Sequence, residues 1–172
     1  MGKKLVMDSA PLVSVLMNCF NGQKYLREAI DSVINQTYKN WELVFWDNQS
    51  TDKSKAIFDS YQDERLKYYY APEHTDLGGG RANAFKYLYG DYIAVLDVDD
   101  IWLPAKLKKQ LQLFTDPDVG IVISDTLFFN ETDERILYDG EYPPEGDVFR
   151  ELLTGYFVSL ETVMLRKSVV DK

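Results

Sequence analysis

Short apolar runs recur along the chain, and each ends at or near polar residues. They lie at residues 12–17, 41–46, 66–70, 92–96 and 119–123. A continuous apolar run of this length is typical of a strand, and one without alternation indicates a strand buried on both faces of a sheet. We therefore predict a strand from each run and expect the first, fourth and fifth to be buried.

The segments between these runs carry apolar residues at helical spacing. The segment Tyr25 to Gln36 carries the i, i+3, i+4 stripe of a helix that packs on a sheet, made of Tyr25, Leu26, Ala29, Ile30, Val33 and Ile34. A second helix is predicted at 52–61, with Ser50 or Thr51 as its cap and an inner face of Ala56, Ile57 and Ser60. A third is predicted at 81–89, directly after Gly78, Gly79 and Gly80. A fourth is predicted after Pro104, with Leu107, Leu111 and Phe114 facing inward.

Strands that alternate with helices indicate an α/β fold with a mainly parallel sheet flanked by helices. The length of 172 residues fits a single domain. Beyond residue 123 the alternation changes, with strands predicted at 126–129, 135–138 and 162–166 and a short helix at 146–154. We expect these segments to form a small antiparallel addition near the C-terminus.

Polar clusters follow three of the predicted strands. Asn18 to Asn21 follow the first, Asp47 and Asn48 follow the second, and Asp97 to Asp100 follow the fourth. Ligands of parallel α/β sheets bind outside the carboxyl ends of the strands. The sequence therefore predicts one site built from three distant segments.

The cluster after the fourth strand contains three carboxylates, Asp97, Asp99 and Asp100. Carboxylates packed together repel one another, so stability alone does not explain them. Their oxygens are the ligands that Mg²⁺ and Mn²⁺ prefer. We predict a site for one of these cations, with a plain polar loop as the alternative.

The net charge of −9 argues against a nucleic-acid partner, which would require a basic surface. An anionic ligand would need a cation between it and the protein. The single cysteine, Cys19, excludes an internal disulfide, and the single histidine, His74, is expected to be an exposed loop side chain.

No apolar run reaches the length needed to cross a bilayer, and residues 1–7 lack the apolar core of a secretion signal. We expect no transmembrane segment and a cytoplasmic location, with peripheral attachment to the inner face of the membrane as a further option.

An acidic pocket that holds a cation can bind a diphosphate. Phe20 is then a candidate stacking surface for a base, with a core aromatic as the alternative. Arg81 could meet a phosphate or orient a ribose, and an exposed helix arginine is the alternative. The glycine triplet before it lacks the spacing of a dinucleotide motif.

The chain resembles the donor-binding half of a family 2 glycosyltransferase with the Rossmann-like GT-A fold. The similarity runs in order from about residue 11 to 123. It rests on residues 13–21, 25–38, 41–43, 47–52 and 90–102. Within the last segment, Asp97-Val98-Asp99 resembles the DxD motif of that family.

The resemblance implies transfer of a sugar from a nucleotide-diphosphate sugar to an acceptor hydroxyl, with inversion and with Mg²⁺ or Mn²⁺. Asp99 would be the principal metal ligand, supported by Asp97. The implied donor is a UDP- or dTDP-sugar, and the acceptor a saccharide or lipid-linked glycan. The implied donor-binding residues are Asn18, Phe20, Asp47, Asn48, Arg81, Asp97 and Asp100. The family often has two aspartates where Asp47 and Asn48 stand, the second accepting from the N3–H of the base, and an asparagine oxygen can do the same.

Inversion requires a general base that removes the acceptor proton. In the family this base is usually an acid of a Glu-Asp motif beyond a strand resembling residues 162–166. Asp125, Glu161 and Asp171 do not fit that pattern, so the base is expected beyond Lys172. We expect residues 11–123 to be the nucleotide-sugar-binding part and 124–172 to begin the acceptor side of a truncated domain.

Two other functions compete with the glycosyltransferase. One is a non-catalytic module that only binds the nucleotide sugar. The other is a phosphatase of the haloacid dehalogenase type with Asp97 as nucleophile and Asp99 as general acid. That class places its Asp-x-Asp after the first strand and a small hydroxyl residue behind it, whereas here the motif follows the fourth strand and precedes Asp100.

Overall fold

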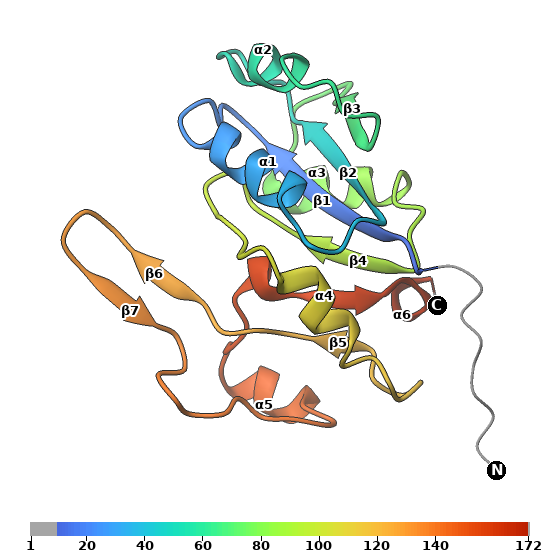
Figure 1. The fold of residues 1–172 in the computed structure, drawn as a ribbon, viewed down its shortest axis with the longest axis vertical. Helices are drawn as coiled ribbons and strands as arrows, with labels where there is room; N and C mark the ends of the chain where they lie inside the picture. The colour runs from blue at the N-terminus through green and yellow to red at the C-terminus, as the bar shows by residue number, and fades with distance from the viewer. Residues whose placement is uncertain (1–9, 172) are drawn as a thin grey trace.

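The structure is a computed structural model, and it describes residues 10–171 (Figure 1). Helices and strands alternate along the chain up to β5, as the hydrophobic pattern predicts. The elements are β1 (Val13–Cys19), α1 (Leu26–Ile34), β2 (Trp41–Asp47), α2 (Ser54–Asp59), β3 (Leu66–Tyr70), α3 (Leu77–Phe85), β4 (Tyr92–Val95), α4 (Lys106–Leu111), β5 (Ile121–Val122), β6 (Leu127–Phe129), β7 (Glu134–Ile136), α5 (Phe149–Thr154), η1 (Leu160–Thr162), β8 (Met164–Arg166) and α6 (Lys167–Val170).

The main sheet has the strand order β3-β2-β1-β4-β8-β5. Strands β3, β2, β1 and β4 are parallel, and β8 runs antiparallel to both β4 and β5. The register pairs Cys19 with Asp47 and Leu16 with Val95, so β1, β2 and β4 end at the same edge. The predicted mainly parallel α/β sheet is confirmed.

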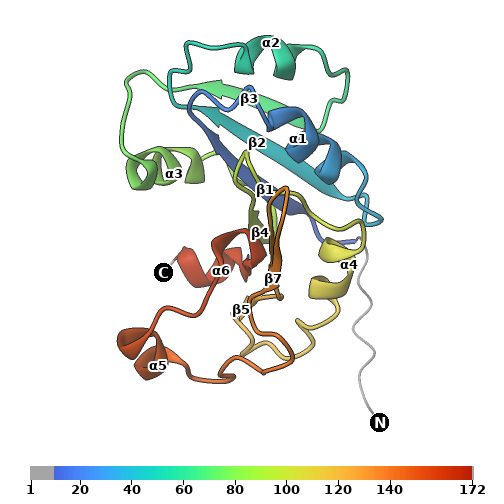
Figure 2. The same cartoon turned by 90° about the vertical axis from the view of Figure 1, so that its left-hand side faces the viewer.

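Helices cover both faces of the sheet (Figure 2). Alternate strand residues separate two apolar cores because successive side chains of a strand point to opposite faces. Val15 and Phe45 pack with α1, α2 and α4 on one face, whereas Leu16 and Trp46 pack with Ala84 of α3 on the other. Both faces of β1 and β2 are therefore buried, which explains their continuous apolar runs.

Three sequence predictions differ from the structure in detail. The strand expected at 119–123 is reduced to Ile121–Val122, and Ile121 is exposed because β5 lies at the edge of the sheet. Helix α2 turns Ser54 and Phe58 inward, not Ala56 and Ser60. Helix α3 begins before the glycine triplet, because the Asp76 carboxylate caps it by accepting from Gly79 N at 2.7 Å.

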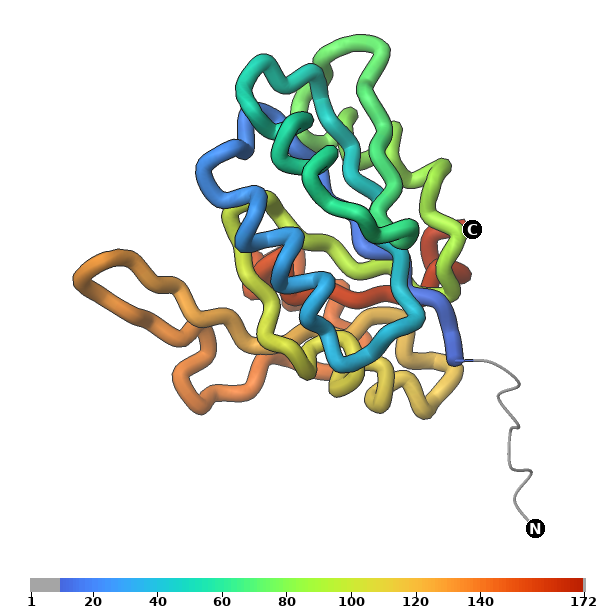
Figure 3. Tube along the Cα trace, turned by 45° about the horizontal axis from the view of Figure 1, so that its top comes forward, coloured from blue at the N-terminus to red at the C-terminus, as the bar shows by residue number. Residues whose placement is uncertain are grey.

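Residues 123–162 form an extension beside this sheet (Figures 1 and 3). It contains the antiparallel hairpin β6–β7, as predicted, and helix α5, in which no residue is buried. Neither apolar core includes a residue of this extension. Among the described residues, the structure contains no helix with the length and apolarity needed to cross a membrane.

Candidate functional site

The loops that follow β1, β2 and β4 meet at the carboxyl edge of the sheet. Asn48 N donates to Cys19 O at 2.8 Å, which joins the first two loops. A Cβ atom on Gly22 would lie 3.0 Å from Val98, so the first loop also packs closely on the third. The predicted convergence of three distant segments is present in the structure.

Phe20 stands at the end of β1 with 50% of its surface exposed, so it is not a core aromatic. Its ring lies 4.4 Å from the ring of His74, centroid to centroid, at a tilt of 50°. His74 is exposed, as predicted, but its place against Phe20 is a feature that the sequence did not reveal. The two rings offer an aromatic surface to a ligand at this edge.

Asp47 is buried, and both of its carboxylate oxygens have protein partners. Oδ1 accepts from Ser50 N at 2.7 Å, and Oδ2 accepts from the Tyr68 hydroxyl at 2.6 Å. Burial, and then this hydrogen bond, raise the pKa of Tyr68 above its ordinary value. Asp47 therefore shapes the loop after β2 from the inside.

Asn48 is buried as well, and its side chain pairs in both directions with Thr75. Nδ2 donates to Thr75 O at 2.7 Å, while Oδ1 accepts from Thr75 N at 3.2 Å and from Thr75 Oγ1 at 3.3 Å. Its backbone oxygen lies 2.8 Å from His74 Nδ1. These contacts hold residues 74 and 75, on the loop after β3, against the end of β2.

Asn18 and Arg81 connect helix α3 to the site. Arg81 Nη2 forms an ion pair with Asp97 Oδ1 at 2.5 Å, so Arg81 is not a free surface side chain. Asn18 Oδ1 is buried and has no hydrogen-bond partner within the described residues. A Cβ on Gly80 would lie 2.7 Å from that oxygen. Glycine at position 80 thus allows α3 to approach β1 and to place Arg81 beside Asp97.

The loop after β4 gathers carboxylates with little positive charge to balance them. Burial raises the pKa of Asp100 to about 7, and the nearby charges of Glu161, Asp99 and Asp97 add to this effect. Within residues 10–171, no three His, Cys, Asp or Glu side chains are close enough together to hold a metal ion by themselves. Mg²⁺ commonly takes one or two carboxylates and completes its shell with water and substrate phosphates, and this oxygen-rich loop fits that mode.

Glu161 is a neighbour of this loop that sequence spacing did not identify as part of the site. Trp102 Nε1 donates to Glu161 O at 2.9 Å, and Glu161 Oε1 accepts from Ser159 Oγ at 2.5 Å and Thr126 Oγ1 at 2.9 Å. The acidic loop is thereby joined to the extension. An acid 61 positions after Asp100 gives no local sequence signal of this contact.

The other two acids considered as a base, Asp125 and Asp171, make different contacts. Asp125 Oδ1 accepts from the backbone N–H groups of Thr126 and Tyr138, at 2.8 and 3.1 Å. Asp171 pairs with Lys167 at 2.7 Å. Both acids therefore already have partners within the protein.

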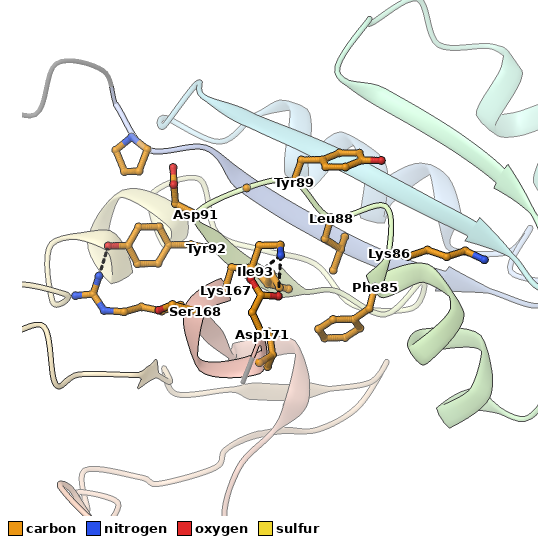
Figure 4. A pocket seen from close by; sticks show the side chains of 14 residues that line it. Phe85, Lys86, Leu88, Tyr89, Asp91, Tyr92, Ile93, Lys167, Ser168 and Asp171 are labelled. Atoms are coloured by element: carbon orange, nitrogen blue, oxygen red, sulfur yellow. Dashed lines mark hydrogen bonds and ion pairs between the residues drawn. The ribbon is translucent and has the colours of Figure 1, made fainter.

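A cavity of about 1070 Å³ lies at the opposite end of β4 (Figure 4). Asp91, Tyr92 and Ile93 line it together with the Lys167–Asp171 ion pair. It contains none of the predicted site residues. This cavity is therefore separate from the carboxyl edge.

The family model described as "Glycosyl transferase family 2" matches residues 14–172. An uncharacterized glycosyltransferase of Methanocaldococcus jannaschii is 34% identical over 170 residues, which covers 94% of this chain and 58% of the relative. The putative teichuronic acid biosynthesis glycosyltransferase TuaG of Bacillus subtilis is 35% identical over 157 residues, covering 90% and 62%. The chain thus spans about 60% of the length of these curated relatives.

Solved structures show the same fold at lower identity. TarS of S. aureus in complex with UDP superimposes with a TM-score of 0.76 at 22% identity, covering 92% of this chain and 48% of that one. Mannosyltransferase PcManGT from Pyrobaculum calidifontis, in complex with GDP-Man and Mn²⁺, gives a TM-score of 0.70 at 18% identity, covering 95% and 46%. The fold is the Rossmann-like GT-A fold. Since the family model covers nearly the whole chain, this chain belongs to glycosyl transferase family 2.

Proposed function

We propose that this chain binds a nucleotide-diphosphate sugar at the carboxyl edge of its sheet and transfers the sugar to an acceptor hydroxyl with inversion. One observation carries the proposal most directly. In a chain of this family, the exposed Phe20, the Arg81–Asp97 pair and the acidic loop around Asp99 come together at one edge. These groups suit the base and the diphosphate of such a donor and the cation that binds with it.

Each residue has a proposed part in donor binding. Phe20 stacks on the base, Arg81 and Asp97 orient the ribose and diphosphate, and Asp100 receives sugar hydroxyls. Asn18 lies beside the base, and its buried Oδ1 makes no hydrogen bond within residues 10–171. Asp47 and Asn48 form the wall behind the base, consistent with their burial.

We propose Mg²⁺ or Mn²⁺ as the cofactor, held by Asp99 with support from Asp97. A bound cation would supply positive charge to a departing diphosphate. Arg81 stands beside Asp97 and so adds a second positive charge at the same place. The solved structure of PcManGT with GDP-Man and Mn²⁺ supports the use of a divalent cation in this fold.

Inverting transfer needs a carboxylate or other base that takes the acceptor proton. Asp125 and Glu161 already accept hydrogen bonds within the extension, and Asp171 is paired with Lys167. We assign the base to none of these three acids. Residues 11–123 are the proposed donor part, and residues 124–172 begin the proposed acceptor part.

The proposed donor is a UDP- or dTDP-sugar, and the proposed acceptor is a saccharide or lipid-linked glycan. An E. coli relative, 28% identical over 160 residues, is named as a transferase from UDP-Glc to a diphosphoundecaprenol-linked sugar, which supports both choices. The location in the cytoplasm, with or without attachment to the inner membrane face, stays a prediction.

Titration calorimetry with UDP in the presence and absence of Mn²⁺ tests the donor site. The unaltered protein is expected to bind UDP only with Mn²⁺, and Asp99→Ala is expected to lose that binding. Glu64→Ala replaces an exposed acid in the turn before β3, and this matched control should bind normally. Binding without metal dependence, or unaffected by Asp99→Ala, would contradict the proposal.

Two activity assays separate the competing functions. Release of UDP from a UDP-sugar in the presence of an acceptor supports the transferase, whereas metal-dependent binding without release supports a binding module. Rapid hydrolysis of p-nitrophenyl phosphate would favour the phosphatase, for which the family assignment gives no support.

A further inference from the structure

The loop after β3 is fixed to the end of β2 by an unusually complete set of polar contacts. Asn48 pairs with Thr75 through its amide nitrogen and its amide oxygen, at 2.7 and 3.2 Å. Gln49 Nε2 adds a bond to Pro72 O at 3.1 Å. The position of His74 between these anchors is therefore set by the protein, even though its ring is exposed.

The hydrogen bond between His74 and Asn48 fixes the tautomer of the imidazole. Asn48 O is a carbonyl oxygen and can only accept, so His74 Nδ1, at 2.8 Å, must carry the proton. In the neutral ring the other nitrogen, Nε2, is then an acceptor. Within residues 10–171, Nε2 makes no hydrogen bond. It is a free acceptor beside the Phe20 ring.

The side-chain oxygen of Asn48 is no longer free for the same task. Oδ1 already accepts from Thr75 N and Thr75 Oγ1, and the residue is only 2% exposed. The resemblance implies that the residue at this position accepts a hydrogen bond from the base, and Asn48 Oδ1 could do so only by breaking its pairing with Thr75. His74 Nε2 can accept without such a cost.

The angle between the two rings suits recognition of a base by its edge. The rings of Phe20 and His74 lie 4.4 Å apart, centroid to centroid, at a tilt of 50°, so a flat base stacked on Phe20 is not parallel to the imidazole and would meet it through its edge. Uracil and thymine carry N3–H and guanine carries N1–H at that edge, whereas cytosine and adenine carry an unprotonated ring nitrogen there. An acceptor facing an acceptor is unfavourable, which discriminates between the two groups.

We propose that His74 is a specificity-determining residue, whose Nε2 accepts a hydrogen bond from the ring N–H of the donor's base and so selects uracil, thymine or guanine. This inference rests on the proposed donor site and deepens it. Asn48 acts as a positioning residue, because it holds His74 and orients its ring.

Calorimetry with UDP and CDP, both with Mn²⁺, tests the inference because the two nucleotides share the diphosphate and differ at the base edge. The unaltered protein is expected to bind UDP about tenfold more tightly than CDP, because UDP gains one hydrogen bond to Nε2 and CDP places an acceptor against it. His74→Phe keeps an aromatic ring and loses the acceptor, so UDP affinity should fall, CDP affinity should not fall, and the preference for UDP should disappear. His74→Gln can donate to Asn48 O and present an oxygen in place of Nε2, so it should restore part of the preference.

The outcomes separate the inference from the donor site itself. Metal-dependent binding of UDP and CDP with equal affinity by the unaltered protein would overturn the role of His74 and leave the donor site intact. An equal loss of affinity for both nucleotides in His74→Phe would show that His74 acts independently of the base, and would also overturn it. Failure of the unaltered protein to bind either nucleotide would overturn both proposals.

Discussion

The carboxylates at this edge of the sheet differ in whether a positive charge lies beside them. Asp97 has Arg81 as its partner at 2.5 Å, whereas the pKa of Asp100 is raised to about 7 by burial and by neighbouring carboxylates. A group whose charge is opposed in this way is poised to gain from an added cation. The imbalance is a property of the folded loop, since the three acids repel less in an extended chain.

Lys106 is a second residue whose charge is costly. Burial lowers its pKa from 10.5 to about 7, against the attraction of Glu161. Its Nζ lies 2.6 Å from Gln110 Oε1 and 4.2 Å from the centre of the Trp102 ring. Lys106 thus packs at the start of the helix that follows the acidic loop. The folded state is more stable when this lysine is neutral, because the buried charge is then absent.

We predict that Lys106 makes stability depend on pH between about 7 and 10.5. In that window the unfolded chain holds a proton that the folded chain has released, so the free energy of unfolding rises with pH, by up to about 1.4 kcal/mol per pH unit. Urea denaturation at pH 7, 8 and 9 should show this rise in the unaltered protein relative to Lys106→Met. A difference between the two proteins that does not change with pH would contradict the prediction.

At the scale of single residues, the sequence predicted which side chains lie at the site, but it did not predict most of their hydrogen-bond partners. Phe20 directly follows β1 and Asp97 comes two residues after the end of β4, so their place at the edge could be inferred from the pattern. The pairing of Asn48 with Thr75 could not, because 27 residues separate them and their contact depends on how the loop after β3 folds back. The same holds for Trp102 and Glu161.

At the scale of elements, the register between β1 and β4 sets the geometry of the site. Leu16 pairs with Val95, and Leu96 N then donates to Leu16 O at 3.0 Å, which carries the acidic loop to the end of β1. This register is fixed at its other end by Gly90. A Cβ there would lie 2.6 Å from Ser14 N and 2.7 Å from Leu12 O.

We predict that Gly90→Ala destabilises the protein by about 1–3 kcal/mol, because backbone atoms cannot move aside as a side chain can. Gly155→Ala is the matched control, since a Cβ at that position meets nothing within 4 Å, and should change stability by less than about 0.5 kcal/mol. Urea denaturation of both variants provides the measurement. Equal stability of the two would show that β1 and β4 do not need this close approach.

The types and order of the elements could be predicted because the core strands are buried on both faces and read as continuous apolar runs. Edges and caps were less predictable. Ile121 is as apolar as any core residue, yet it is 55% exposed because β5 is the last strand of the sheet. The start of α3 depends on one hydrogen bond from Gly79 N to Asp76, and the glycines that follow would not by themselves favour a helix.

At the scale of the whole molecule, the sheet with its helices contains the apolar cores, and the extension exposes apolar side chains. Both apolar cores belong to the sheet and its helices, whereas the extension of residues 123–162 exposes large apolar side chains such as Phe129, Phe149 and Leu153. The chain matches only about 60% of the length of its curated relatives. The extension contacts the acidic loop through Glu161, but none of its residues belongs to either apolar core.

We predict that Phe129→Ala changes the free energy of unfolding by less than about 0.5 kcal/mol, since this side chain is 63% exposed on β6. Leu107→Ala, which truncates a fully buried side chain of α4, should cost about 2–5 kcal/mol. Both values come from urea denaturation under the same conditions. A large loss in Phe129→Ala would mean that the hairpin is part of the folded core.

The central claim, that distant segments form one donor site at the carboxyl edge, is tested most directly by a crystal structure of this protein with UDP and Mn²⁺. We predict the uracil ring on Phe20 beside His74, and the diphosphate with Mn²⁺ next to Asp99. A nucleotide in the cavity lined by Asp91 and Lys167, or bound anywhere away from Phe20 and Asp99, would contradict the account.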